Sequence, residues 1–156
     1  MTRFSFRPGW LVLLLLLLLA GFAGFYFLQP LSLPPLPEEV VRIDVSSTRL
    51  QPYEMEQEAY ALSPDSHQWA QLEELLSQVT VHRCVQTLSG STSTGDTGGR
   101  VLGFYGRDGE NNLLWELTVT GGSHLRMGDQ VYHLGWWDNL AGQELAEALA
   151  QLLEES

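Results

Sequence analysis

The fold is decided by residues 100–136, RVLGFYGRDGENNLLWELTVTGGSHLRMGDQVYHLGW. Four short runs rich in β-branched and aromatic residues follow one another here, and this pattern predicts consecutive strands. Turns are predicted at residues 106–112, at residues 120–122 and at Gly128-Asp129, where a glycine in the first place of a two-residue loop favours a type II′ turn. Because such short connections join antiparallel neighbours, the stretch predicts an antiparallel meander.

The last hairpin of this stretch sets two histidines against each other. With Gly128-Asp129 as its loop, His124 lies opposite His133 on the neighbouring strand. Directly opposed Cβ atoms lie about 4.5–5.5 Å apart, which is close enough for both imidazoles to reach one ion. Zinc needs at least one more ligand, and no sequence-local Asp, Glu or Cys is positioned to supply it. The sequence therefore predicts neither a metal site nor a cofactor, and favours an exposed polar pair.

The alternation of side chains in this hairpin predicts which residues face solvent. Tyr132, Leu134 and Trp136 fall on one face and are expected in the core. Trp137, which follows Trp136 directly, has two possible placements. It covers the core beneath the last helix, which we favour, or it lies exposed beside His133. The residues assigned to a candidate binding surface are His124, Arg126, His133 and Trp137.

Further strands are predicted before the meander. Alternating apolar residues predict a strand over 40–45, and a second strand over 53–62 would return from a turn at 46–52. Another strand is expected over 79–88, where apolar and polar residues alternate again. The predicted order is therefore two strands, a helix, five strands and a helix.

Two helices complete the predicted domain. Ser63-Pro64-Asp65 has the residue types of a helix start, and the following segment carries an apolar stripe. A closing helix is predicted over 139–156, with Asp138 or Asn139 as its N-cap. The sequence thus predicts an α+β fold: a curved antiparallel sheet meander packed against two helices and preceded by one N-terminal transmembrane helix. The two stripes are Trp69, Leu72, Leu76 and Val79, and Leu145, Leu149 and Leu152.

Residues 10–28 form an uncharged apolar stretch, WLVLLLLLLLAGFAGFYFL. At about 1.5 Å per residue, a helix of this length matches a hydrocarbon core of about 30 Å. The alternative is a cleaved signal peptide, with Gly21-Phe22-Ala23 as the cleavage site. We favour an uncleaved signal anchor because the apolar residues continue to Leu28, beyond the roughly 7–15 residues of a signal peptide.

The charges on either side of this stretch predict its orientation. Arg3 and Arg7 precede it, and Glu38 is the first charged residue after it. The excess of positive charge predicts a single-pass protein of the plasma membrane with its N-terminus in the cytoplasm and its C-terminal domain outside. The prolines of the linker predict a stiff, extended spacer. The predicted parts are a short cytoplasmic N-terminus (1–9), a transmembrane helix (10–28), a proline-rich linker (29–39) and an extracytoplasmic domain (40–156).

The part that follows the apolar stretch is strongly acidic, with six arginines and no lysine against nineteen acidic residues. Nucleic acids and anionic lipid surfaces bind clustered cations, so such a domain would be repelled, and no nucleic-acid partner is predicted. The absence of lysine also excludes Schiff-base chemistry. The single cysteine, Cys84, cannot form an intrachain disulfide and is expected to be an inert buried thiol within its strand.

Residues 88–100, LSGSTSTGDTGGR, contain two partial enzyme motifs. Gly90 and Gly95 have the spacing of a phosphate loop, but Asp96 replaces the lysine and would repel phosphate. Asp96-Thr97-Gly98 resembles the aspartic protease tripeptide, yet glycines flank it where that family has apolar residues. A Ser-His-Asp site has no supporting Gly-x-Ser-x-Gly elbow. We therefore predict a loop of small polar residues and no enzyme.

A resemblance to a known class rests on residues 104–135, FYGRDGENNLLWELTVTGGSHLRMGDQVYHLG, together with the leading and closing helices. The chain resembles, over residues 40–155, the small uncharacterised extracytoplasmic domains of single-span membrane proteins and lipoproteins of Gram-positive bacteria. The markers are the Asp108-Gly109 turn and Tyr132 in the last strand. These families have no established catalytic residues, so the resemblance implies no site residue.

These observations predict a membrane-anchored extracytoplasmic interaction or sensory module that is not catalytic. Its expected partners are membrane lipid, through the N-terminal helix, and a protein of the cell envelope. Two alternatives stay open. One is a cell-envelope hydrolase, whose sign would be a deep pocket with His82 or an acid beside His124 and His133. The other is a structural accessory subunit of a membrane complex.

Overall fold

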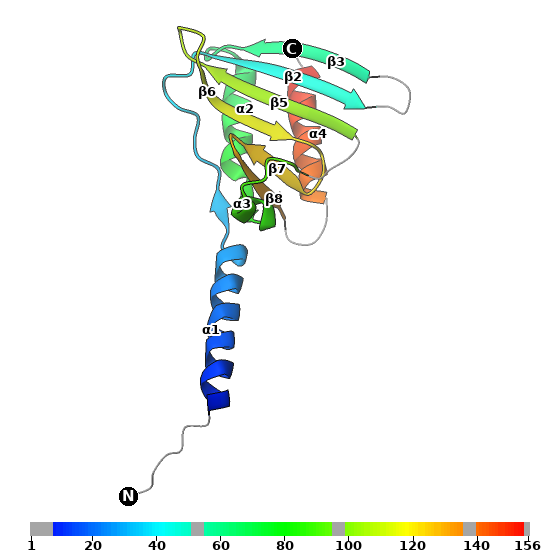
Figure 1. Cartoon of the computed structure of the whole chain (residues 1–156). Coiled ribbons are helices and arrows are strands. Elements are labelled where there is room, and N and C mark those ends of the chain that lie inside the picture. The colour runs from blue at the N-terminus through cyan, green and yellow to red at the C-terminus, as the bar shows by residue number, and fades with distance from the viewer. Residues whose placement is uncertain (1–7, 51–54, 95–98, 136–139, 155–156) are drawn as a thin grey trace, which may run out of the picture.

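The computed structural model describes residues 8–50, 55–94, 99–135 and 140–154. These residues contain one open eight-stranded sheet in the order β1-β4-β8-β7-β6-β5-β2-β3, in which all neighbouring strands are antiparallel. The fold class is therefore α+β with an antiparallel sheet, as the sequence predicted. The apolar helix α1 (Pro8–Leu28) extends away from the sheet (Figure 1).

The strands β5 to β8 form the predicted meander, and earlier strands extend it at both edges. β2 pairs with β5 and carries β3 outside it, while β4 pairs with β8 and carries β1. The turn predicted at 46–52 was wrong in part, because β2 stays paired on both sides up to Leu50. The strands are β1 (Leu31–Ser32), β2 (Arg42–Leu50), β3 (Met55–Leu62), β4 (Thr80–Arg83), β5 (Gly99–Arg107), β6 (Leu113–Val119), β7 (His124–Met127) and β8 (Gln130–Leu134).

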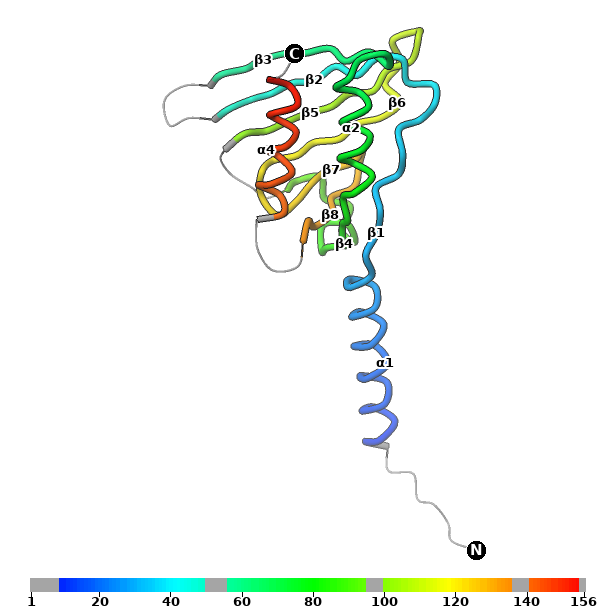
Figure 2. Tube along the Cα trace, turned by 180° about the vertical axis from the view of Figure 1, so that it is seen from behind, coloured from blue at the N-terminus to red at the C-terminus, as the bar shows by residue number. Residues whose placement is uncertain are grey.

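The helices α2 (His67–Gln78) and α4 (Leu140–Glu154) lie across the same side of the sheet (Figure 2). The predicted start of the first was wrong: its N-cap is Ser66 rather than Ser63, and the Trp69 N–H donates to the Ser66 hydroxyl at 3.2 Å. The predicted caps of α4, Asp138 and Asn139, lie outside the described residues.

One hydrophobic core contains residues of both helices and of the sheet face beneath them. Phe104 lies at its centre on β5, paired with Val45 on one side and Leu117 on the other, and all three are almost fully buried. The two predicted helix stripes contribute buried residues in the same way. These are Trp69, Leu72 and Leu76 from α2, and Leu145, Leu149 and Leu152 from α4.

The strand predicted over 79–88 ends at Arg83, and a short helix, α3 (Val85–Ser89), follows it. The Cys84 N–H donates to the Thr87 hydroxyl at 2.9 Å, which folds the backbone into a turn in place of a further strand residue. Gly90 then ends the helix with a φ of 66°, a value in the left-handed region that favours glycine. The prediction that Cys84 lies within a strand was therefore wrong.

The proline-rich segment after α1 packs against the domain. β1 pairs with β4, and Leu33 is only 9% exposed within the core. At the end of α1 the Arg83 guanidinium lies over the Tyr26 ring, 4.7 Å from the ring centroid, and it donates to the Gln29 side chain at 3.5 Å. The segment that was expected to be a spacer between the helix and the domain thus forms an edge of the domain itself.

The turn between β5 and β6 is held by one carboxylate. Asp108 accepts hydrogen bonds from the Asn112 side chain at 2.9 Å, from the Asn112 N–H at 2.8 Å and from the Glu110 N–H at 2.9 Å. These bonds favour the ionised form, and the bond from the Asn112 side chain contributes most to lowering the pKa of Asp108. A group with a lowered pKa stabilises the fold above its unfolded pKa, and this contribution is lost as the pH falls through the folded pKa.

We expect the Asp108 carboxyl to titrate below its ordinary pKa of 3.8 in the full-length protein held in detergent micelles. The substitution Asn112→Ala should move this midpoint upward because it removes the strongest of the three donors. Carbon-13 NMR of the carboxyl group measures both values, with Asp129, an exposed acid in another turn, as the internal control. An Asp108 midpoint that is the same in both proteins would contradict the assignment.

Candidate functional site

The sheet has one face under α2 and α4 and a second face, here the open face, which those helices do not cover (Figures 1 and 2). Polar side chains of β2, β5 and β6 lie on it, and their charges are paired. Asp44 contacts Arg42 at 2.9 Å and Arg107 at 2.8 Å, and Glu116 is bonded to Arg126. These three arginines and two carboxylates make the open face polar and ion-paired within this acidic domain.

The tyrosine of β5 lies flat on the open face. A β-carbon at Gly103 would stand 2.7 Å from the Tyr105 hydroxyl and 3.0 Å from its ring, so the ring covers this glycine. A glycine within a strand commonly marks such a close approach. Tyr105 thereby presents a half-buried aromatic surface between Asp44 and Glu116, its register partners on β2 and β6.

A row of three histidines crosses the open face. The predicted pairing of His124 with His133 is confirmed, and the two rings meet edge to face with centroids 4.9 Å apart. The loop of this hairpin has Gly128 at a φ of 54° and no positive φ at Asp129, as a type II′ turn requires. His82 of β4 lies opposite His133 on its other side and extends the row.

The three histidines of the row differ in burial and in their contacts. His82 is 6% exposed, whereas His124 and His133 are half-buried. The Ser123 hydroxyl lies 3.0 Å from His124 Nδ1, and the Gly135 carbonyl lies 3.1 Å from His133 Nδ1. Within the four described segments, no three His, Cys, Asp or Glu side chains are grouped so as to hold a metal ion.

The other residues assigned to the binding surface have different outcomes. Arg126 lies on the open face, but it is bonded to Glu116 and donates to the Thr118 hydroxyl at 3.2 Å. Its guanidinium is therefore bonded to side chains of the neighbouring strand β6. Trp137 lies outside the described residues, as does Trp136, whose place in the core was predicted. Tyr132 and Leu134 pack on the core side, as predicted.

The helix α3 covers one end of the open face. Val131 is fully buried there although it does not belong to the main core. Its carbonyl accepts from the Thr87 hydroxyl and lies 3.4 Å from the Cys84 sulfur. Cys84 is a free, half-buried thiol whose contacts hold α3 on β8. The Asp96-Thr97-Gly98 tripeptide lies outside the described residues.

Sequence reasoning missed two adjoining cavities beside α4, each lined in part by arginine and glutamate. One measures about 240 Å³ and the other about 310 Å³, and both are lined by Arg49 and Arg100. These arginines are register partners on β2 and β5, an arrangement that is unfavourable for like charges. Glu56 lies opposite Arg49 on β3, and Glu154 bonds to Arg100 at 3.2 Å, so acidic residues offset the pair. Because the chain has only eight Lys and Arg residues, Arg49 and Arg100 could have been singled out from the sequence as candidates.

Tyr60 lines the smaller cavity and donates its hydroxyl proton to Glu58 at 2.7 Å. This hydrogen bond is the main reason that the pKa of Tyr60 is raised, and desolvation and the Glu58 charge act in the same direction. The tyrosine therefore stays neutral and serves as a hydrogen-bond donor. The cavity thus combines cations, carboxylates and hydroxyls, groups that can bind a polar ligand.

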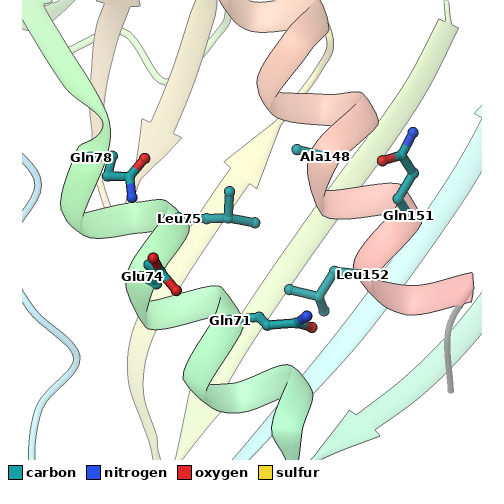
Figure 3. Close-up of a pocket in the computed structure, with 7 residues that line it drawn as sticks. All are labelled: Gln71, Glu74, Leu75, Gln78, Ala148, Gln151 and Leu152. Carbon is teal, nitrogen blue, oxygen red and sulfur yellow. The ribbon is translucent and has the colours of Figure 1, made fainter.

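A groove of about 300 Å³ lies between α2 and α4 on the outer side of the helices (Figure 3). Leu75 and Leu152 stand between the two helices, and glutamines occupy most of its rim. Glu74 is the only charged residue in its lining.

No match comes from the comparisons: no family model, no curated protein and no solved structure matches the chain.

Proposed function

We propose that the chain is a single-pass membrane protein whose extracytoplasmic domain is a non-catalytic interaction module, of the kind carried by single-span proteins of Gram-positive bacteria. The helix α1 supports the membrane assignment, since residues Gly9–Leu28 are long and apolar enough to cross a bilayer and none of that stretch is buried in the domain. The charges support the orientation, with Arg3 and Arg7 on the cytoplasmic side and Glu38 outside.

The open face is the surface that we assign to a protein partner, and the observation that carries this assignment is the contrast between the two sides of the sheet. One side is closed by α2 and α4 over the core, whereas the other presents Tyr105 and the His124–His133 pair. Aromatic rings and imidazoles give contact area together with hydrogen bonds, as protein interfaces need. The paired charges around them avoid the cost of desolvating isolated ions.

Photo-crosslinking in membranes tests this assignment. A photoreactive phenylalanine analogue at Tyr105 should form a defined adduct with an envelope protein, because that side chain lies on the open face. The same analogue at Gln151, an exposed residue of α4, is the matched control and should form none. The full-length protein must also remain in the membrane pellet after alkaline extraction, as a spanning helix requires.

Three results would overturn the proposal. Release of the protein by alkaline extraction would remove the membrane span. Adducts from Gln151 and none from Tyr105 would place the interface on the helices. Turnover in a substrate screen by the purified protein, with no adduct from Tyr105, would favour the envelope hydrolase.

A further inference from the structure

The short helix α3 lies at the end of the domain that faces α1 (Figures 1 and 2). Strand β4 runs back toward α1 and leads into α3. It is antiparallel to β1, which follows α1 in the chain, with Thr80 paired to Ser32 and Val81 to Leu31. At the end of β4, the Arg83 guanidinium lies over the ring of Tyr26, two residues before α1 ends. Two helical residues span only about 3 Å, so α3 begins close to the level at which α1 ends.

Two apolar side chains of α3 point into solvent. Val85 is 70% exposed and Leu88 is 59% exposed, and outside α1 these are the most exposed large hydrophobic residues in the part of the chain that the structure describes. Residues three apart lie on the same side of a helix, so the two side chains form one small apolar surface. An exposed apolar surface of this kind marks a contact with a partner or a membrane.

The charge around α3 differs from that of the rest of the domain. Residues 80–94 contain no acidic residue, and neither do residues 29–37, although the chain carries 19 acids in all. Arg83 is the only Lys or Arg in either segment. The overall acidity of the domain would repel an anionic lipid surface, but these two segments, which follow and adjoin the end of α1, would not.

We propose that α3 inserts Val85 and Leu88 into the interface of the bilayer that α1 crosses, with Arg83 at the level of the lipid headgroups. This inference rests on the proposed membrane span. Interfacial helices bury their apolar side about 5–10 Å into the boundary between headgroups and acyl chains, and an arginine beside them binds phosphate. The domain is then held on the membrane at two points, α1 and α3, which fixes its orientation.

Depth-dependent fluorescence quenching tests this contact in the full-length protein. In a Cys84→Ser background, single cysteines at Leu18, Leu88 and Leu113 are labelled with bimane, and each protein is reconstituted into phosphatidylcholine vesicles. Leu18 reports on α1, and Leu113, an exposed leucine at the start of β6, is the matched control. Lipids brominated near the headgroup should quench the Leu88 label, lipids brominated at the chain end should quench the Leu18 label, and neither should quench the Leu113 label.

The outcomes separate this inference from the proposed function. Quenching at Leu18 with none at Leu88 would overturn the α3 contact and leave the membrane span intact. A blue-shifted Leu88 label that brominated lipid does not quench would place protein, and not lipid, against α3. An unquenched Leu18 label would overturn both the span and the contact. The Cys84→Ser change should preserve α3, because a hydroxyl can replace the thiol beside Thr87 and the Val131 carbonyl.

Discussion

Replacing Phe104 by alanine is expected to lower the free energy of unfolding of the domain by about 3–5 kcal/mol. Phe104 is fully buried at the centre of the core, on a strand that is paired on both sides. Removing the ring leaves a cavity, because the paired backbones around it cannot close over the space. A loss of this size is a large part of the about 5–15 kcal/mol by which a domain is usually stable.

Denaturant unfolding of the full-length protein in detergent micelles measures the loss, with the fluorescence of the core tryptophans Trp69 and Trp115 as the signal. Phe104→Leu is the conservative variant and should cost less than about 1.5 kcal/mol if the core repacks. Leu114→Ala removes an exposed side chain of the neighbouring strand and should change stability by no more than about 0.5 kcal/mol. A Phe104→Ala variant as stable as Leu114→Ala would show that the core is placed wrongly.

The features that the sequence predicts well are those set by local pattern. Strand alternation and a two-residue loop are enough to bring His124 opposite His133, because neither depends on distant parts of the chain. The same holds for the stripe that includes Leu72 and Leu76, which follows from the helical period alone. These elements carry the candidate site, so its central pair could be predicted.

The features that it misses depend on which strands become neighbours. His82 joins the histidine row only because β4 pairs with β8, which lies about fifty residues later in the chain. Arg49 and Arg100 face each other for the same reason, through the pairing of β2 with β5. Periodicity gives each residue a face but does not give the strand order, since pairing between distant strands is decided by the packing of the whole core.

Short-range exceptions to a strand pattern are equally hard to predict. Cys84 continues the alternation of apolar and polar residues in β4. Its N–H nevertheless donates to the Thr87 hydroxyl, and the chain turns into α3. Serine and threonine side chains compete with strand hydrogen bonds in this way, and the outcome depends on a second contact. Here that contact is the Val131 carbonyl on β8, which no local window of the sequence reveals.

Replacing Gly142 by alanine is expected to destabilise the domain by about 3 kcal/mol, the upper part of the usual range for overpacking. Gly142 lies in the first turn of α4, where it packs directly on the backbone between β6 and β7. A β-carbon there would overlap the Gly122 carbonyl oxygen and stand 2.7 Å from its carbonyl carbon. Backbone atoms cannot rotate away as a side chain can, so the helix or the connection must move.

The sign of this effect is what makes the experiment decisive. In an ordinary helix, glycine to alanine stabilises by about 1 kcal/mol, because alanine restricts the unfolded chain and has the best helix propensity. Gly109→Ala is the matched control, since nothing lies within 4 Å of its added β-carbon and its φ is not positive. Denaturant unfolding should therefore show a loss for Gly142→Ala and little change for Gly109→Ala. A gain at Gly142 would mean that α4 does not approach the β6–β7 connection, and the helix would then have to sit elsewhere on the sheet.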